Sequence, residues 1–481
     1  MSPTTKFLIA LLAATSLSAC ATVGPNFQAP DAPKSSSSLG AGETAPAAAR
    51  LDANTANAGP WWTALKSPEL DTTIRQALKD SPTLAEADAT LAQSQSALAQ
   101  ARGVAGPQVT GNAGIARERA NLQAFGFTGF GDIQLSNPTF SLYSVGGAVS
   151  YDLDLWGGNK RRIEGAAARA EAQGRRAEAA YLSLTANVAL QAATIATLRA
   201  QIASVEQMIA DDQANIDLIH KANALGGSTS LAKVSAASQL EEDRGRLPAL
   251  QGELAAARHA LAVLVGKAPA DWAAPAFDLA TMTLSAPVPV ALPSQIARQR
   301  PDILAAEAEL HAATADIGVA TADLYPNIKL SASLTQGSLK PGDLFSYDAS
   351  GWDIGAGLTA PIFDGGALKA RRQQAREAAR AASARYQQTV LTAFGQVADA
   401  LSALSADETA LAAQGRTEQQ AAERLRLAKI AFDKGGGTLL EVIDAQRTLN
   451  AARSTRARAE GQRLVDAIRL FAATGADWRT D

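Results

Sequence analysis

The sequence has very little cysteine, few aromatic residues and no large excess of charge of either sign. Only position 20 of the 481 is cysteine, so no disulfide can form within the chain. Aromatic residues make up 5%, and the formal net charge at pH 7 is −3. The lysines and arginines are interspersed with acids, so nothing in the composition favours binding to nucleic acid, and we expect no nucleic-acid partner. Alanine dominates the apolar residues, which favours long helices in close contact over a thick globular core.

Residues typical of catalytic and cofactor sites are also scarce. The three histidines, His220, His259 and His311, are far apart and show no metal-ligand spacing. No glycine-rich loop follows a strand in the manner of a phosphate-binding site, and a cysteine nucleophile is missing after position 20. We therefore expect no enzyme activity, no cofactor and no metal site.

The first residues have the pattern of a secretory signal. An apolar stretch from Phe7 to Leu17 is shorter than the about 20 residues that cross a bilayer. The following residues, Leu17-Ser18-Ala19-Cys20, resemble the lipobox of bacterial lipoproteins, in which Cys20 would carry the lipid. Ala21, in place of aspartate, favours the outer membrane by the rule for such lipoproteins. The alternative is that Cys20 is an unpaired cysteine in a discarded peptide.

The chain is internally duplicated. The helical stretch that opens at Pro82 aligns with the one that opens at Pro301. The glycine pair at 157–158 aligns with the pair at 365–366, and LGGSTSLAKVSAASQL aligns with KGGGTLLEVIDAQRTL. These pairs follow the same order along the chain, about 210 residues apart, so the two halves have one architecture.

Each half contains two segments in which apolar and polar residues alternate. The alternation predicts strands at about 107–117, 142–156, 326–336 and 351–363. Isolated hairpins of this kind are barely stable in water. A membrane barrel is the other interpretation, because strands of about 10 residues span a bilayer with an apolar face toward lipid. Four strands cannot close such a barrel, so several chains would have to form it together.

Long helical runs connect these strands to two glycine clusters. The runs from Gly158 to about 223 and from Gly366 to about 434 contain no proline, and each predicts a helix of roughly 100 Å. The first cluster is Gly226-Gly227 and the second is 435–437, and each is followed by Ser or Thr and another helical stretch. Glycine suits the end of one helix and Ser or Thr the start of the next, which predicts two helical hairpins.

Together these motifs resemble the TolC-like outer-membrane efflux proteins, of the lipid-anchored NodT-type branch. The segments that carry the resemblance are the lipobox with VGPNFQAP, WWTALKSPELDTTIRQAL, YDLDLWGG, PIFDGG and KGGGTLLEVIDAQRTL, with the two proline-opened helices. The resemblance implies a mainly α-helical fold class with a membrane β-barrel. Three chains would give four strands each to one 12-stranded barrel, which a long α-helical periplasmic barrel continues.

The resemblance also implies roles for the hairpin tips. Glu441 and Asp444 match acids that form the periplasmic gate in the family; three positions apart, they share one helix face. From the residues alone, a solvated acidic pair at a helix start is the alternative. Some family members have tyrosine and arginine, which help to lock the tip, where this chain has Phe432 and Gly437. The residues expected to contact an adaptor are Leu225, Gly226, Gly227, Ser228, Thr229, Gly435, Gly436, Gly437, Thr438 and Leu439.

The function that follows is a passive outer-membrane duct for drugs or other small molecules, in a tripartite efflux or type I-like export system. The implied partners are two further copies of the chain, a periplasmic adaptor, an inner-membrane pump driven by protons, and outer-membrane lipid. The alternative is a periplasmic lipoprotein scaffold with coiled-coil hairpins and no channel. The expected division is 1–19 signal peptide, 20–60 lipidated extended segment, 61–270 first repeat, 271–300 equatorial linker, 301–474 second repeat and 475–481 tail.

Overall fold

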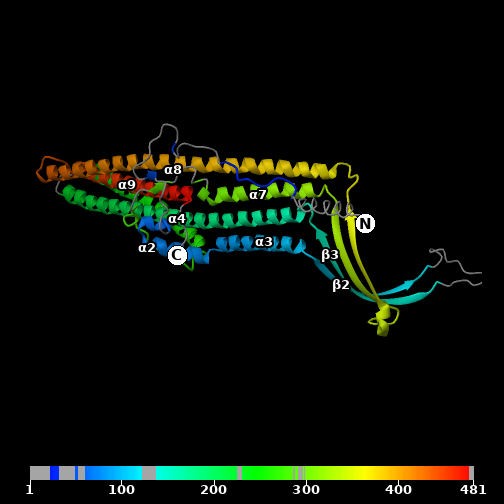
Figure 1. Ribbon diagram of the computed structural model, residues 1–481. Helices are drawn as coiled ribbons and strands as arrows, with labels where there is room; N and C mark the ends of the chain where they lie inside the picture. The colour runs from blue at the N-terminus through cyan, green and yellow to red at the C-terminus, as the bar shows by residue number, and fades with distance from the viewer. Residues whose placement is uncertain are drawn as a thin grey trace, which may run out of the picture. The chain divides into compact units, whose positions relative to one another are not determined.

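The computed structural model describes residues 22–31, 39, 49–51, 60–121, 137–224, 230–284, 288–290, 296 and 298–475 (Figure 1). Its long helices are α2 (Pro68–Asp80), α3 (Pro82–Val104), α4 (Gly158–Ala224), α5 (Ser230–Leu264), α7 (Pro301–Ala322), α8 (Ala367–Asp433) and α9 (Leu439–Thr474). Three short 3₁₀ helices are η1 (Trp61–Leu65), η3 (Pro341–Asp343) and η4 (Tyr347–Ala349). The strands are β1 (Ala49–Leu51), β2 (Gln108–Arg119), β3 (Thr139–Leu153), β4 (Val288–Val290), β5 (Asn327–Ser338) and β6 (Ser350–Thr359).

The chain forms two compact units, and both contain parts of each sequence repeat. Unit 1 comprises 1–30, 92–172 and 307–384, and unit 2 comprises 31–91, 173–306 and 385–481. Helices α4 and α8, each of 67 residues, begin in unit 1 and end in unit 2. The compact units therefore differ from the sequential division into repeats.

Unit 1 holds an antiparallel sheet of four strands in the order β2-β3-β5-β6 (Figure 1). The central pair, β3 and β5, joins the first repeat to the second. Strand β6 ends at Thr359, before the position 363 that alternation suggested, and Pro361 just beyond has no N–H for a ladder bond. Strand β3 begins at Thr139 and ends at Leu153, three residues before the expected bounds at both ends. Within the described residues, β2 and β6 each pair on one side only.

Unit 2 has the larger hydrophobic core, built around aromatic residues from both ends of the sequence. Trp61 and Trp62 are buried, and the Trp61 ring stacks on Phe471 of α9 with centroids 5.3 Å apart. The Trp61 indole N–H donates to Thr185 Oγ1 of α4 at 3.3 Å, and the Trp62 N–H donates to Asp71 at 2.9 Å. Because both indole donors are satisfied, these side chains can be fully buried without an unpaired polar atom.

Candidate functional site

The unit 1 sheet separates apolar from polar side chains in rows across all four strands. Residues Val109, Val149, Ala332 and Ile354 stand opposite one another in register. The neighbouring row is Thr110, Ala148, Ser333 and Asp353, in which Ser333 donates a hydrogen bond to Asp353. Adjacent residues of a strand face opposite sides, so the first row lies on one face and the second row on the other.

The apolar face of this sheet carries large side chains that are mostly exposed, which is unfavourable in water. Val109 is 75% exposed, Ile354 78% and Trp352 75%. A row of large apolar side chains on one face and polar side chains on the other is the pattern of a membrane β-barrel strand. Strands β2 and β6 each have one edge without a partner strand in this sheet. In lipid the N–H and C=O groups of these edges would have no hydrogen-bond partner, so further strands must pair with them.

A buried arginine holds the segment 22–30 against the start of α4. The Arg161 side chain is 3% exposed. Its Nε donates to Val23 O at 3.2 Å, and its Nη2 donates to Gly24 O at 3.3 Å and to Asn26 Oδ1 at 2.7 Å. We call Arg161 with these three acceptors the N-terminal clasp. A Cβ on Gly24 would stand 2.5 Å from the Gly318 Cα of α7, so only glycine allows this approach.

An ion pair and a ring stack complete the clasp. Arg161 Nη1 donates to Glu164 at 2.8 Å, and His311 Nε2 lies 3.0 Å from the other Glu164 oxygen. The Phe27 ring stacks on His311 with centroids 4.4 Å apart. Burial opposes ionisation of Glu164, but the hydrogen bonds from Arg161 and His311 outweigh it and lower the pKa of this carboxyl. His311, one of the three histidines without metal-ligand spacing, thus helps to hold the N-terminal segment.

Several predicted site residues lie outside the described residues. These are the lipid-attachment residue Cys20 and the first tip, Leu225, Gly226, Gly227, Ser228 and Thr229. The second tip, Gly435, Gly436, Gly437, Thr438 and Leu439, is described in full.

The second tip is a tight turn between α8 and α9. The N–H groups of Gly435, Gly436 and Gly437 donate to carbonyls of the last turn of α8, at 2.9, 2.9 and 3.0 Å. Gly435 has φ +77°, the left-handed conformation that favours glycine at a helix end. A Cβ on Gly437 would stand 3.0 Å from the Ala431 Cβ. Helix α9 starts with a capping box, in which Thr438 Oγ1 accepts from Glu441 N–H and Glu441 accepts from Thr438 N–H.

The two acids predicted to form a gate lie exposed at this start of α9. Glu441 carries the capping box, so one of its oxygens has a local structural role. Asp444 forms an ion pair with Arg424 of α8, and Arg424 also donates to Thr448 Oγ1 at 3.3 Å. Sequence spacing placed both acids on one helix face but gave no sign of Arg424, which lies 20 positions before Asp444.

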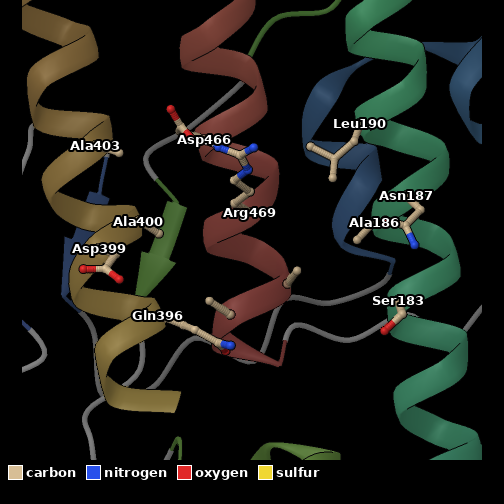
Figure 2. A pocket seen from close by; sticks show the side chains of 12 residues that line it. Ser183, Ala186, Asn187, Leu190, Gln396, Asp399, Ala400, Ala403, Asp466 and Arg469 are labelled. Carbon is tan, nitrogen blue, oxygen red and sulfur yellow. Dashed lines mark hydrogen bonds and ion pairs between the residues drawn. The ribbon is translucent and has the colours of Figure 1, made fainter. Parts of the chain in front are cut away.

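A groove in unit 2 brings together polar side chains from three helices (Figure 2). It has a volume of about 520 Å³; α4 contributes Ser183 and Asn187, α8 contributes Gln396 and Asp399, and α9 contributes Asp466 and Arg469. Figure 2 shows Asp466 and Arg469 on the central helix, between α8 and α4. Arg469 donates to Asp466 at 2.8 Å, so the main charges of the α9 face are paired.

The described residues contain little further chemistry outside these sites. No group of three or more His, Cys, Asp or Glu residues there could hold a metal ion. One helix of that part of the chain, Gly158–Lys221, is long and apolar enough to cross a membrane. Since 56% of its most apolar window is buried, and core helices pass the same test, we assign it to the protein core.

These features define the class of an outer-membrane channel: a one-sided apolar sheet, long helical hairpins and a turn with acids at its tip. The family model described as outer membrane efflux protein matches residues 73–267 and 292–476. The pyoverdine export outer membrane protein OpmQ of Pseudomonas aeruginosa is 31% identical over 438 residues, 90% of either chain. The cation efflux system protein CusC of Escherichia coli is 30% identical over 352 residues, 73% of this chain and 76% of CusC. The outer-membrane channel OprN has a structure with TM-score 0.84 and 25% identity, which covers 95% of this chain and all of OprN.

The chain belongs to the outer membrane efflux protein family. The fold class expected from the sequence is confirmed: a mainly helical, duplicated chain of the trimeric TolC-like channels, which gives four strands to a barrel continued by helices. The predicted function of an outer-membrane efflux channel, a passive conduit for export, is confirmed by the same family membership. Proteins of this family are channels and not enzymes.

Proposed function

We propose that this duct is gated at the tip of the α8–α9 hairpin, by Glu441 and Asp444. The observation that carries the proposal is the position of both acids, exposed in the first two turns of α9 beside the glycine turn. In a homotrimer, three tips would bring six carboxylates around one axis. Like charges held close together attract cations, so the ring would act as constriction and electrostatic filter.

Arg424 modifies the electrostatics of this gate. Its ion pair with Asp444 partly neutralises one acid of each copy, while Glu441 faces no cation of its own hairpin in this part of the structure. We therefore assign most of the negative charge of the filter to Glu441. The ion pair between Arg424 and Asp444 would instead hold α8 and α9 together at the tip. Both side chains of that pair are more than half exposed, so its strength depends on salt.

The proposed partners are those of a tripartite assembly. A periplasmic adaptor would grip the tips, and exposed apolar side chains at the hairpin ends support this: Leu231 is 74% exposed, Val234 65% and Leu440 71%. Apolar groups gathered at one end commonly mark a protein contact. We propose no catalytic role and no cofactor for this chain. The energy would come from an inner-membrane pump, which we expect to be driven by protons.

The N-terminal clasp supports lipid anchoring at Cys20. Thr22 lies two residues after Cys20, and its side chain packs against Gly157, at the turn from β3 to α4. The described residues that follow Cys20 are therefore held at the base of the strands, which supports the proposed lipid attachment. The stacked pair of Trp156 and Tyr325, with centroids 4.6 Å apart, is at the same level, as expected for aromatic residues at a membrane interface.

The cargo would be small molecules that the pump selects. The names of the relatives refer to pyoverdine export and to cation efflux, two different kinds of cargo. A wide water-filled duct needs no specific pocket for its cargo.

Conductance across a planar bilayer, measured on the detergent-purified protein, tests this function. We expect channels with a preference for cations, and Glu441→Gln should reduce that preference more than Asp444→Asn. Glu377→Gln is a matched control, because Glu377 pairs with Arg380 in α8 within unit 1. A monomer without conductance would favour the periplasmic scaffold. Channels with unchanged selectivity in the Glu441→Gln, Asp444→Asn double variant would refute the gate.

A further inference from the structure

Two carboxyl groups are buried against each other in the first hairpin, within unit 2. Asp212 of α4 is 5% exposed and Asp243 of α5 is fully buried. Both helices bury mainly alanine, leucine and isoleucine nearby, including Ile216 and Leu240. Acidic side chains are almost never buried to this extent unless they are paired with a cation or neutralised.

The hydrogen-bond partners of this pair are incomplete. Gln239 Nε2 donates to Asp243 Oδ2 at 3.2 Å, whereas Asp243 Oδ1 and Asp212 Oδ2 are buried and accept no hydrogen bond. The Asp243 carboxyl lies close enough to Asp212 to raise the pKa of Asp212. Two carboxylates have no donor between them, so this contact needs one proton, which one group carries and the other accepts.

The cations around the pair do not replace that proton. Arg246 Nη1 lies 3.4 Å from Asp243 Oδ1, and half of the Arg246 side chain is exposed to water. Arg447 of α9 favours ionisation of Asp212, but its buried Nε makes no hydrogen bond. The adjacent Asp211 adds negative charge. Burial and the Asp243 carboxyl outweigh Arg447 and raise the pKa of Asp212 to about 6.

The same part of α4 is tied to the second hairpin. Asp211, next to Asp212, accepts hydrogen bonds from Gln446 Nε2 at 2.6 Å and from Asn450 Nδ2 at 2.8 Å. Both donors are on α9, and Gln446 is two residues beyond Asp444. These two hydrogen bonds connect this part of α4 to the start of α9, which carries the proposed gate.

We propose that Asp212 and Asp243 form a proton-binding site that regulates the gate: the shared proton holds α4 against α5 and favours the closed tip, and its loss favours opening. The proposal rests on the proposed gating function. When the proton leaves, two buried carboxylates repel each other across the α4–α5 contact. The hairpin that Asp211 connects to α9 then loses its tight packing, and the channel opens more readily.

The direction of the pH effect follows from the raised pKa. The folded, closed form holds a proton that an unperturbed aspartate would release near pH 4, so the closed form is favoured at acidic pH. As pH rises through about 6, the proton is lost and closure weakens. Asn in place of Asp243 keeps an N–H donor toward Asp212 at every pH, and so imitates the protonated pair.

Single-channel recordings at pH 5 and pH 7.5 on the intact protein test the proposal, with Asp243→Asn as the variant. We expect the wild-type ratio of open time to closed time to rise roughly tenfold between these pH values. A tenfold rise corresponds to a difference of about one unit between the pKa of the pair in the closed form and in the open form. In Asp243→Asn this ratio should stay low at both values. Asp407→Asn, at a separate, partly buried acid on α8, is the matched control and should keep most of the wild-type response.

The possible outcomes separate the two proposals. If the open-to-closed ratio responds to pH equally in wild type and in Asp243→Asn, the proton site is overturned. The same conclusion follows if only Asp407→Asn loses the pH response. A well-folded trimer without any conductance would overturn the gated channel. If Asp243→Asn does not fold, Asp212→Asn takes its place. Infrared difference spectra between the two pH values should show a protonated carboxyl band that the variant lacks, and an unchanged band would refute the assignment.

Discussion

Gly461 of α9 lies so close to Thr197 of α4 that a Cβ atom on Gly461 would stand 2.0 Å from the Thr197 Oγ1. The Thr197 hydroxyl donates to Ala193 O at 2.8 Å, so it cannot move away without losing that bond. The α9 backbone at Gly461 therefore packs directly against the Thr197 side chain of α4, within unit 2.

Gly461→Ala should destabilise the protein and separate α4 from α9. The added methyl overpacks the contact, at a cost of about 1–3 kcal/mol in the free energy of unfolding. Thermal unfolding in detergent would measure this loss as a lower midpoint. Gly252→Ala is the control, because a Cβ at this exposed position of α5 meets nothing within 4 Å. That change should stabilise the helix by about 0.5–1 kcal/mol. Equal effects of the two changes would refute the close contact.

The three tip glycines should differ in their response to alanine. Gly435 has φ +77°, so alanine there costs about 1–2 kcal/mol in backbone strain. A Cβ added at Gly437 would have the Ala431 Cβ and the Phe432 N within 3.1 Å, so alanine there pushes on α8. Gly436 has neither constraint and is the internal control. Hydrogen exchange of residues 431–438 should accelerate in the first two variants only. Acceleration in Gly436→Ala alone would contradict the turn geometry.

Local patterns in the sequence were sufficient for much of this fold. Alternation located the four strands of the sheet, and a glycine cluster followed by Thr438 indicated a turn and a helix start. These signals are short-range, because they depend on residues a few positions apart. The predicted strand 351–363 ran past Pro361, which has no N–H to donate, and was wrong at this end because β6 ends at Thr359.

Contacts between distant residues could not be predicted in this way. Arg161 meets Asn26 across 135 positions, and Asp211 meets Asn450 across 239. Asp212 and Asp243 look like ordinary exposed acids of an amphipathic helix, and only the packing of α4 on α5 buries them. Each of these contacts depends on how two helices are rotated against each other. No local pattern in a single sequence determines that rotation.

Arg161→Met should release the segment 22–30 from the body of unit 1. The change removes the donors for two backbone carbonyls and for Asn26, at a cost of about 1–3 kcal/mol. Hydrogen exchange of the Val23 amide, which donates to Trp156 O at 3.0 Å, would report the release. Arg162→Met is the matched control, since the exposed Arg162 bonds only to Asn159 among the described residues. An unchanged Val23 exchange rate in Arg161→Met would refute the clasp.

Asp407→Asn should stabilise the protein at pH 7.5 and leave its stability at pH 5 nearly unchanged. Burial and the neighbouring carboxyl of Asp466 raise the pKa of Asp407 to about 6, and its buried Oδ2 accepts no hydrogen bond. An aspartate whose pKa is raised in the folded state contributes most stability at acidic pH, and this contribution is lost as pH rises through about 6. Asparagine removes the charge that causes the loss. Denaturant unfolding at both pH values measures the difference, with Asp399→Asn, at an exposed acid of α8 that lines the groove, as control. A variant less stable than wild type at pH 7.5 would show that Asp407 is ionised and favourably paired.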